Sequence, residues 1–282
     1  MSKNKDKKEE SIKLTEETEQ QTADLSADDT DSAAADDNGS FVKYFKICGM
    51  SEDEVRERLK DIADSVNPKL SINTVPGEVH ITLEAMPEEG SSAKKAGKPM
   101  VKEIKNRFGL NIYSTDMETT LEQAVVELLR TNSLFLSTCE SCTGGMVASR
   151  IIDVPGASEV FKEGFVTYSN KAKRSRLGVK KSTLLKYGAV SEQTAKEMVK
   201  GCASAAKANV TLSTTGIAGP DGGSEDKPVG LVYIGCSVCG KTKVVKYNFK
   251  GDRALIRRQA ASAALALLRM CVLEYYSEKN FL

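Results

Sequence analysis

Residues 134–152 read Leu134-Phe135-Leu136-Ser137-Thr138-Cys139-Glu140-Ser141-Cys142-Thr143-Gly144-Gly145-Met146-Val147-Ala148-Ser149-Arg150-Ile151-Ile152. An apolar run typical of a strand, 134–138, passes through a polar turn into a helical pattern, 146–152. Such a junction lies at the carboxyl edge of a sheet, where the N–H groups and dipole of the helix favour anions. Ser141 is therefore a candidate nucleophile or part of an anion site. Taken alone, residues 140–145 fit a Ser or Thr helix cap beside a glycine turn slightly better, so the rest of the chain must decide.

The composition indicates a protein with a real core in a reducing compartment. The chain has 282 residues, of which 40% are hydrophobic, enough for one large domain or two smaller ones. No run of 18 apolar residues occurs and the start of the chain has no apolar signal segment, so we expect a cytoplasmic protein without a membrane span. Seven cysteines, an odd number scattered through apolar segments, favour reduced thiols.

The net charge of +1 hides an asymmetry. Residues 1–40 carry twelve Asp or Glu against five Lys, a balance of minus seven, which leaves plus eight for the remainder. We take this excess as spread along the chain. It suits a small anionic substrate, and nucleic acid is not expected as a partner.

The chain divides into three segments. Residues 1–39 are acidic and lack aromatic residues, so we expect a disordered tail. Residues 40–113 predict a small α+β domain, and residues 114–282 a larger α/β domain.

The small domain is expected to run strand, helix, strand, strand, helix. Its elements are strand 41–47, a helix capped by Ser51 that follows Val55, Leu59, Ile62 and Val66, strands 70–75 and 78–85, a helix through Met100, Ile104 and Phe108, and a short strand at 110–112. This order also occurs in KH modules, which clamp nucleic acid with a Gly-x-x-Gly loop. No such loop stands between residues 41 and 113, so a structural or interaction role is favoured over RNA binding.

The large domain is expected to alternate helices and strands and to close with a hairpin. The pattern gives helix 121–129, the strand and helix quoted above, strand 165–168, helix 173–177, helix 192–208 capped by Ser191, strand 210–215, strands 231–238 and 243–248, and helix 253–275. Such an order predicts a three-layer α/β/α sandwich with a mixed sheet.

Histidine can be excluded as the base for Ser141. The single histidine, His80, lies in a predicted strand of the small domain, so a Ser-His-Asp arrangement within 117–282 is impossible. Lys173 is the natural partner if burial lowers its pKa from about 10.4, and Tyr168 could share the proton. Lys173 could equally be an ordinary solvent-exposed lysine, and Tyr168 an ordinary aromatic residue at the edge of the core.

Two further patterns carry weaker signals. The glycine-rich run 216–224, together with Lys227, suits close approach to a phosphate but lacks the Gly-Lys-Ser/Thr ending of a P-loop. The pairs Cys139-x-x-Cys142 and Cys236-x-x-Cys239 could together suggest a zinc site, an alternative we do not favour.

Several motifs resemble the C-terminal domain of the CinA family, also known as nicotinamide-nucleotide amidohydrolase. They are ESCTGG at 140–145, DVPGAS at 153–158, YSNKAK at 168–173, GAVS at 188–191, TGIAGPDGGSEDKPVG at 215–230 and GDR at 251–253. The resemblance covers about residues 117–275, and the middle domain looks like the small domain that precedes it in full-length members. Cys139 stands where the family usually has a small residue such as Ala.

The resemblance implies hydrolysis of nicotinamide mononucleotide to nicotinate mononucleotide and ammonia, without a metal or organic cofactor. Ser141 would be the nucleophile, while Lys173 and Tyr168 would handle its proton. Thr143 would cap the following helix and leave Ser141 just before it. The residues implied to bind substrate are Glu140, Cys142, Thr143, Gly144, Asn170, Thr215, Gly216, Gly219, Gly222, Gly223, Ser224 and Arg257.

The resemblance also bears on partners. The substrate would be a pyridine mononucleotide, and Arg257 could approach its phosphate from a neighbouring subunit of a homo-oligomer. Full-length members begin with a larger domain associated with ADP-ribose pyrophosphatase activity. This chain has only an acidic tail there, so no pyrophosphatase activity is expected. The alternative is a catalytically silent nucleotide-binding or interaction protein whose middle domain contacts RNA or another partner.

Overall fold

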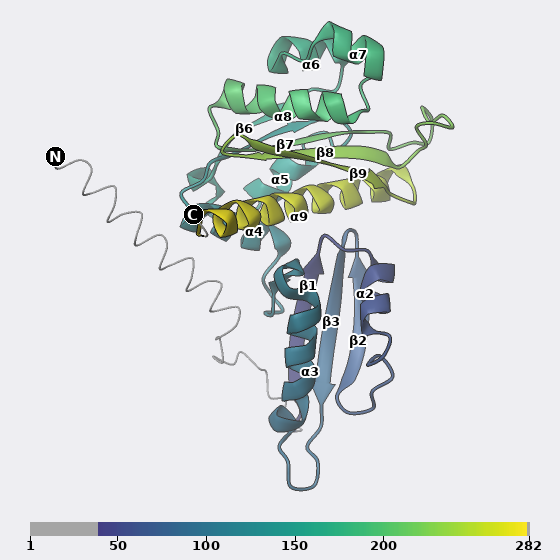
Figure 1. The fold of residues 1–282 in the computed structure, drawn as a ribbon, viewed down its shortest axis with the longest axis vertical. Coiled ribbons are helices and arrows are strands. Elements are labelled where there is room, and N and C mark those ends of the chain that lie inside the picture. Colours follow the sequence, from purple (N-terminus) through teal and green to yellow (C-terminus); the bar gives the residue numbers. More distant parts are fainter. Residues whose placement is uncertain (1–38, 281–282) are drawn as a thin grey trace, which may run out of the picture.

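The computed structural model describes residues 39–280 as two sheets with their helices (Figure 1). One sheet has the strand order β2-β3-β1-β4 and the other β6-β5-β7-β8-β9. The acidic tail predicted for residues 1–39 lies, up to residue 38, outside the described residues.

The first sheet belongs to a small KH-like α+β domain. Its elements are β1 (Phe41–Cys48), α2 (Glu52–Leu59), β2 (Lys69–Val75), β3 (Glu78–Ala85), α3 (Ala93–Phe108), the 3-10 turn η1 (Gly109–Asn111) and β4 (Ile112–Ser114). All its strand pairs are antiparallel. Phe45, Ile47 and Ile81 are fully buried, and Leu59 and Ile104 bring the two helices into the same core.

Two boundaries of this domain differ from the prediction. Helix α2 ends at Leu59 instead of continuing to Val66, which is 91% exposed. Beyond Leu59 the N–H groups of Ile62 and Ser65 donate to carbonyls three residues back, a tighter turn, while the Asp61 carboxylate is held by the guanidinium of Arg107 on α3. Asp and Ser weaken helices by such local bonds, which the apolar spacing does not reveal. The predicted strand 110–112 is displaced as well, because a 3-10 turn delays pairing until Ile112.

The second sheet belongs to a three-layer α/β/α domain, which confirms the predicted fold class. Its elements are α4 (Leu121–Thr131), β5 (Leu136–Glu140), α5 (Met146–Ile152), η2 (Ala157–Glu159), β6 (Phe161–Val166), α6 (Asn170–Leu177), α7 (Lys181–Tyr187), α8 (Glu192–Ala206), β7 (Val210–Gly216), β8 (Leu231–Val238), β9 (Lys241–Asn248) and α9 (Arg253–Asn280). Strands β6, β5 and β7 are parallel, whereas β8 and β9 are antiparallel, so the sheet is mixed.

Helices cover both faces of this sheet (Figure 1). Helix α8 lies on one face, with α6 and α7 outside it, and α4, α5 and α9 lie on the other. Buried alanines and leucines of α9 join the main core, because small side chains let the helix pack closely on the sheet. Helix α7 escaped prediction because its sequence, KSTLLKY, is too short to show a clear apolar period.

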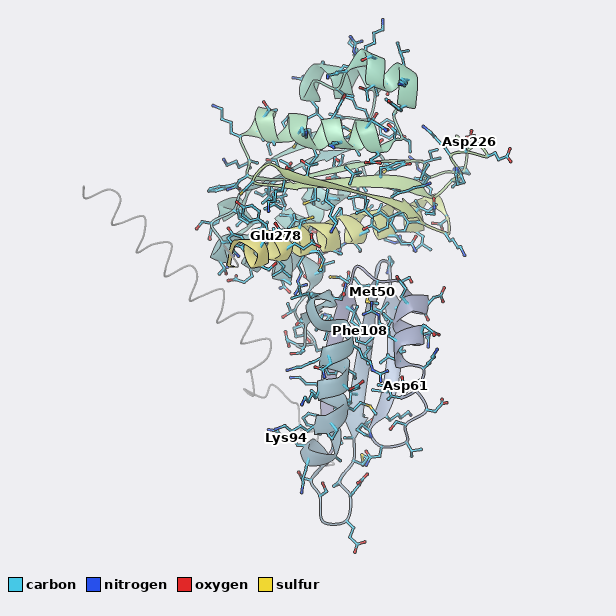
Figure 2. The ribbon with its side chains drawn as sticks, in the orientation of Figure 1. Met50, Asp61, Lys94, Phe108, Asp226 and Glu278 are labelled. Atoms are coloured by element: carbon cyan, nitrogen blue, oxygen red, sulfur yellow. The ribbon has the colours of Figure 1, made fainter. Side chains whose placement is uncertain are left out.

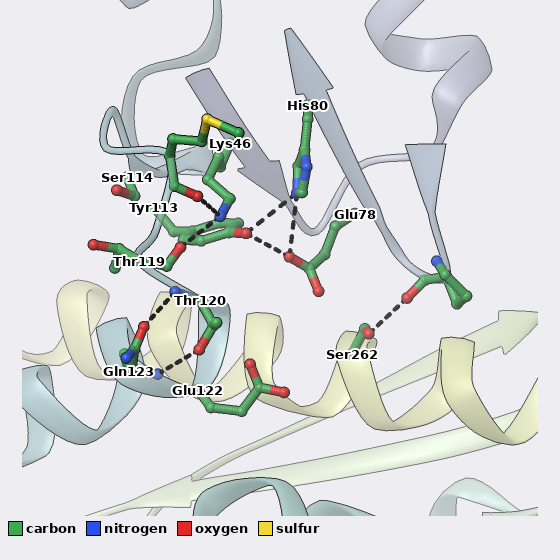
Figure 3. A network of polar contacts seen from close by, with 12 residues as sticks. Lys46, Glu78, His80, Tyr113, Ser114, Thr119, Thr120, Glu122, Gln123 and Ser262 are labelled. Carbon is green, nitrogen blue, oxygen red and sulfur yellow. Dashed lines mark hydrogen bonds and ion pairs between the residues drawn. The ribbon is translucent and has the colours of Figure 1, made fainter. Parts of the chain in front are cut away.

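Polar contacts join the two domains (Figure 3). The Lys46 ammonium donates to the carbonyls of Met117 and Thr119 at 2.9 and 2.7 Å. Within the small domain, the Tyr113 hydroxyl donates to Glu78 at 2.6 Å and lies 3.3 Å from the ring nitrogen of His80, so the one histidine packs against residues of its own domain.

A second set of contacts fixes the turn between β2 and β3 against the large domain. The hydroxyl of Ser262 on α9 donates to the carbonyl of Pro76 at 2.6 Å. The guanidinium of Arg150 on α5 donates to Ser262 at 2.7 Å and reaches Glu78 at 3.4 Å. Since α5 and α9 also border the candidate site, the small domain contacts two helices that support it. Within residues 39–280 no helix combines the length and apolar character needed to cross a bilayer.

Candidate functional site

The carboxyl ends of the three parallel strands meet at one edge of the sheet. Glu140, the last residue of β5, pairs with Val166 on β6 and with Thr214 on β7. The N–H of Ser141 continues this pairing by donating to the carbonyl of Thr214 at 2.9 Å. Polar residues that follow separate strands in the sequence therefore come together, as expected for an open α/β sheet.

Ser141 and Lys173 form a buried pair at this edge. The Lys173 ammonium nitrogen lies 2.8 Å from the Ser141 hydroxyl oxygen, 2.9 Å from the Thr167 carbonyl and 3.4 Å from the Tyr168 carbonyl. Only 1% of Lys173 is exposed. Ser169 caps α6 by accepting from the N–H of Ala172, and this fixes the turn of helix that carries Lys173.

The surroundings of Lys173 favour its neutral form. Burial lowers the pKa of its amine, and the opposing effect of the neighbouring Cys142 and Cys139 thiols is smaller. A neutral amine has two N–H bonds and one lone pair. If the Thr167 and Tyr168 carbonyls accept the two N–H bonds, the lone pair remains for the hydroxyl proton of Ser141. This is the geometry of a nucleophile and its base.

Glu140 holds the turn that follows Ser141. Its carboxylate accepts from the Thr143 hydroxyl at 2.6 Å and from the N–H groups of Gly145, Val147 and Ala148 at 2.9 to 3.1 Å. The prediction that Thr143 caps the helix is wrong, because Gly145 occupies the cap position and Glu140 supplies the acceptor. A carboxylate at a helix start is favoured by the dipole as well as by the hydrogen bonds.

Arg257 on α9 supports the same turn from behind. Its guanidinium donates to the Cys142 carbonyl at 3.1 Å and to the Thr143 carbonyl at 2.8 Å. In a trans peptide the N–H points opposite to the carbonyl. The N–H groups of Thr143 and Gly144 are thus directed away from Arg257, and among the hydrogen bonds of the described residues neither has a protein acceptor.

A pocket of about 250 Å³ opens beside the pair. Ser141, Lys173 and Tyr168 line it, together with five residues of the predicted substrate set, Cys142, Thr215, Gly216, Gly219 and Gly222. The other lining residues are Ala189, Val190, Ile217, Ala218, Asp221 and Arg253. The structure thus brings all three residues predicted for catalysis to one cavity, but Tyr168 meets Lys173 through its backbone carbonyl and its hydroxyl contacts Arg253, so its sharing of the Ser141 proton stays a prediction.

The remaining predicted substrate residues lie elsewhere. Glu140 and Thr143 are buried and bonded to each other, and Arg257 contacts the back of the turn. Gly144, Asn170, Gly223 and Ser224 are not among the residues that line the pocket, and Ser224 bonds instead to Lys227 within its own loop. Their contact with a substrate stays a prediction.

Sequence reasoning missed Arg253 as a lining residue. Its guanidinium donates to the Gly219 carbonyl at 2.8 Å and lies 3.5 Å from the Tyr168 hydroxyl. Arg253 is the arginine of the GDR motif at 251–253, which could have indicated it. The sequence-based prediction assigned phosphate contact to Arg257, four residues further along, instead. Arg253 is the exposed cation of the lining set, so it is placed to meet an anionic group.

Tyr168 borders the pocket from outside. Its side chain is 64% exposed, and its hydroxyl contacts Arg253, while its carbonyl faces Lys173. The ring therefore offers a flat apolar surface at the mouth.

Lys227 fastens the glycine-rich loop. Its ammonium donates to the carbonyls of Tyr187 and Val190 at 2.7 and 2.8 Å, so it ties the loop to the turn before α8. Figure 2 shows Asp226, its neighbour, on a loop that projects from the sheet edge.

The four thiols of the two Cys-x-x-Cys pairs do not lie together at one site. Cys139 is buried beside Cys202, and Cys236 beside Cys271. All seven cysteines are free, and within residues 39–280 no cluster of three or more His, Cys, Asp or Glu is placed to hold a metal.

The fold and the site define a class: a three-layer α/β protein with a buried Ser-Lys pair at the strand ends, preceded by a KH-like domain. Residues 118–272 match the family described as the CinA C-terminal domain, and residues 42–114 match the damage-inducible protein CinA KH domain. The chain belongs to the CinA family.

Relatives agree with this assignment. The chain is 48% identical to a putative competence-damage inducible protein of Clostridium beijerinckii over 82% of this chain and 57% of that protein, and 47% identical to a CinA-like protein of Kosmotoga olearia over 83% and 57%. It therefore spans a little over half the length of these relatives.

Solved structures resemble the larger domain. A competence/damage inducible protein from Agrobacterium tumefaciens is 37% identical, with a TM-score of 0.51, over 56% of this chain and 98% of that one. A CinA superfamily protein from Escherichia coli is 34% identical, with a TM-score of 0.52, over 57% and 97%.

Proposed function

We propose that the chain hydrolyses the carboxamide of nicotinamide mononucleotide to nicotinate mononucleotide and ammonia. The observation that carries the proposal is the 2.8 Å contact between the Lys173 amine and the Ser141 hydroxyl in a pocket without histidine. A serine is a weak nucleophile unless a neighbouring base accepts its proton, and a buried lysine whose pKa is lowered by desolvation can serve as that base.

The reaction proceeds in two stages. Ser141 attacks the carboxamide carbon while its proton passes to Lys173, and the tetrahedral oxyanion accepts from backbone N–H groups of the turn that begins at Cys142, which lines the pocket next to Ser141. Lys173 then protonates the departing nitrogen, and ammonia leaves an acyl ester on Ser141. Water adds to this ester with Lys173 again as base, which releases the carboxylic acid and the free serine.

The pocket supports an aromatic nucleotide as substrate. The exposed ring of Tyr168 can stack on a pyridine, and the Gly216–Gly222 segment lets backbone approach the ligand closely. Arg253 can pair with the phosphate, since guanidinium and phosphate oxygens bind strongly. We assign this role to Arg253 rather than Arg257, whose guanidinium already bonds two carbonyls.

The test is direct. The full chain is incubated with nicotinamide mononucleotide, and ammonia and nicotinate mononucleotide are measured together. Ser141→Ala should abolish both products while the variant stays folded and binds the substrate. Activity that persists in Ser141→Ala would refute the mechanism, and a folded wild type that releases no ammonia would refute the function in favour of a silent nucleotide-binding protein.

A further inference from the structure

The net positive charge of residues 41–282 lies on the helices at one side of the larger sheet. Residues 170–207, which include α6, α7 and α8, hold ten Lys or Arg and two Glu, a balance of plus eight. The other residues of 41–282 hold twenty-five cationic and twenty-five acidic residues, a balance of zero. The excess expected to be spread along the chain is therefore concentrated on α6, α7 and α8, the helices on one side of the sheet (Figure 1).

Nine of these ten cations are exposed, and Lys173 is the buried exception. They are Lys171, Arg174, Arg176, Lys180, Lys181, Lys186, Lys196, Lys200 and Lys207. Among the ion pairs of the described residues none involves these nine. Of the two acids, Glu197 accepts from the Lys180 N–H and the Thr183 hydroxyl, so it serves the local fold. We call the nine residues the basic layer.

A groove runs through the basic layer. It has a volume of about 550 Å³ and is lined by three lysines, Lys180 from the α6–α7 connection and Lys196 and Lys200 from α8, and by one acid, Glu197. Its floor is the close contact of α6 with α8, where a Cβ on Gly201 would meet the Leu177 carbonyl at 1.8 Å. Three ammonium groups beside a groove suit a chain of anions better than a single ion.

An aromatic residue stands at the end of α7. Tyr187 is 38% exposed, and the Lys186 ammonium lies 5.1 Å from its ring centre. Positive side chains that follow a backbone, with an aromatic face for a base, are the features that bind single strands without sequence preference.

We propose that the basic layer binds the phosphate backbone of a single-stranded nucleic acid, with Tyr187 stacking on a base. The site lies outside the amidase pocket and does not depend on the amidase reaction. The acidic segment 1–40 is the competing occupant, but its twelve acids are accompanied by five lysines and it carries no aromatic ring for Tyr187. The charge excess and the aromatic face together favour nucleic acid.

The test uses the full chain and a fluorescent dT20 strand in 50 to 200 mM KCl. We expect binding that weakens steeply with salt, because each neutralised phosphate releases counterions. The triple variant Lys180→Gln, Lys196→Gln, Lys200→Gln should flatten the slope of log affinity against log salt by about two. The matched control is Lys95→Gln, Lys98→Gln, Lys102→Gln on α3, which removes the same charge from the KH-like domain and should leave the slope unchanged.

Tyr187→Ala separates stacking from charge. It should weaken dT20 binding about tenfold without changing the salt slope. Absence of binding at 50 mM KCl, or equal loss in both triple variants, would overturn the proposal. The proposal would also be overturned if inorganic polyphosphate competed as well as unlabelled dT20 and the Tyr187→Ala substitution had no effect on dT20 binding. Binding that appears only after Asp28, Asp29, Asp31, Asp36 and Asp37 are changed to Asn would identify the acidic segment as the occupant instead.

Discussion

The Arg257 guanidinium lies 2.8 Å from the carbonyl oxygen of Thr143, on the side of the turn opposite to the free N–H of Gly144. A second bond, to the Cys142 carbonyl, fixes the preceding peptide. Two successive peptide planes are thereby held before any substrate arrives. Dipoles oriented in advance stabilise an oxyanion without reorganisation during the reaction.

Arg257 and Arg253 should consequently differ in kinetics. Arg257→Met should lower kcat roughly tenfold to a hundredfold with little change in KM, because the turn loses its orientation. Arg253→Met should mainly raise KM, by about tenfold or more, because a charged contact to the phosphate is lost. Steady-state kinetics on nicotinamide mononucleotide measure both. The reverse pattern, a raised KM in Arg257→Met alone, would restore Arg257 as the phosphate ligand.

Lys173 should control the pH dependence of turnover. Lys173→Met removes the base and should lower kcat by roughly 10⁴-fold while substrate binding persists. In the wild type, kcat should rise with pH through the lowered pKa of Lys173, since the neutral amine is the active form. A kcat that is flat over this range, or a Lys173→Met variant with normal turnover, would leave Lys173 as a structural residue.

Lys173 should destabilise the folded protein at pH values below the pKa that its amine has in the unfolded chain. The folded pKa is lowered, so between it and the unfolded value of about 10.5 the unfolded chain binds more protons and stability rises with pH. A difference of one pH unit between the folded and unfolded pKa corresponds to about 1.4 kcal/mol in the free energy of unfolding. Lys173→Met should be more stable than the wild type at neutral pH, and the difference should shrink towards pH 10. Urea unfolding at several pH values checks this, and a constant difference would contradict it.

Glu140 should contribute strongly to stability, because its carboxylate is buried and accepts four hydrogen bonds. Glu140→Gln places an amide where four donors converge on a carboxylate, so we expect a loss of about 2 to 4 kcal/mol. Glu163→Gln on the exposed edge strand β6 is the matched control and should change stability by less than about 0.5 kcal/mol. Equal effects in the two variants would show that the carboxylate does not hold the turn.

The layers and the Ser-Lys pair could be predicted because they follow from short-range signals. The order of apolar periods defined the sheet, and the absence of histidine from residues 117–282 left few bases for Ser141. Which face of the turn each side chain occupies could not be predicted. Arg257 and Arg253 are one helical turn apart on α9, yet Arg253 lines the pocket while Arg257 contacts the back of the turn that follows Ser141.

The capping of α5 escaped prediction for a similar reason. Glu140 is the last residue of a strand, and it reaches forward to N–H groups up to eight residues later. Sequence rules look for the capping residue at the helix start itself, where Gly145 has no side chain to offer.

The turn between β2 and β3 offers a test of the domain contact. Gly77 has a φ of +85°, and a Cβ there would lie 2.5 Å from the Cβ of Ser262 on α9. Gly90 has a similar φ of +77° with nothing within 4 Å, so Gly90→Ala measures the backbone strain alone. Gly77→Ala should be destabilising by about 1 to 3 kcal/mol more than Gly90→Ala, because the turn must withdraw from Ser262 and Arg150. Thermal unfolding compares the two, and limited proteolysis should cut Gly77→Ala faster between the domains. Identical stability of the two variants would mean that the contact between Gly77 and α9 does not contribute to the free energy of unfolding.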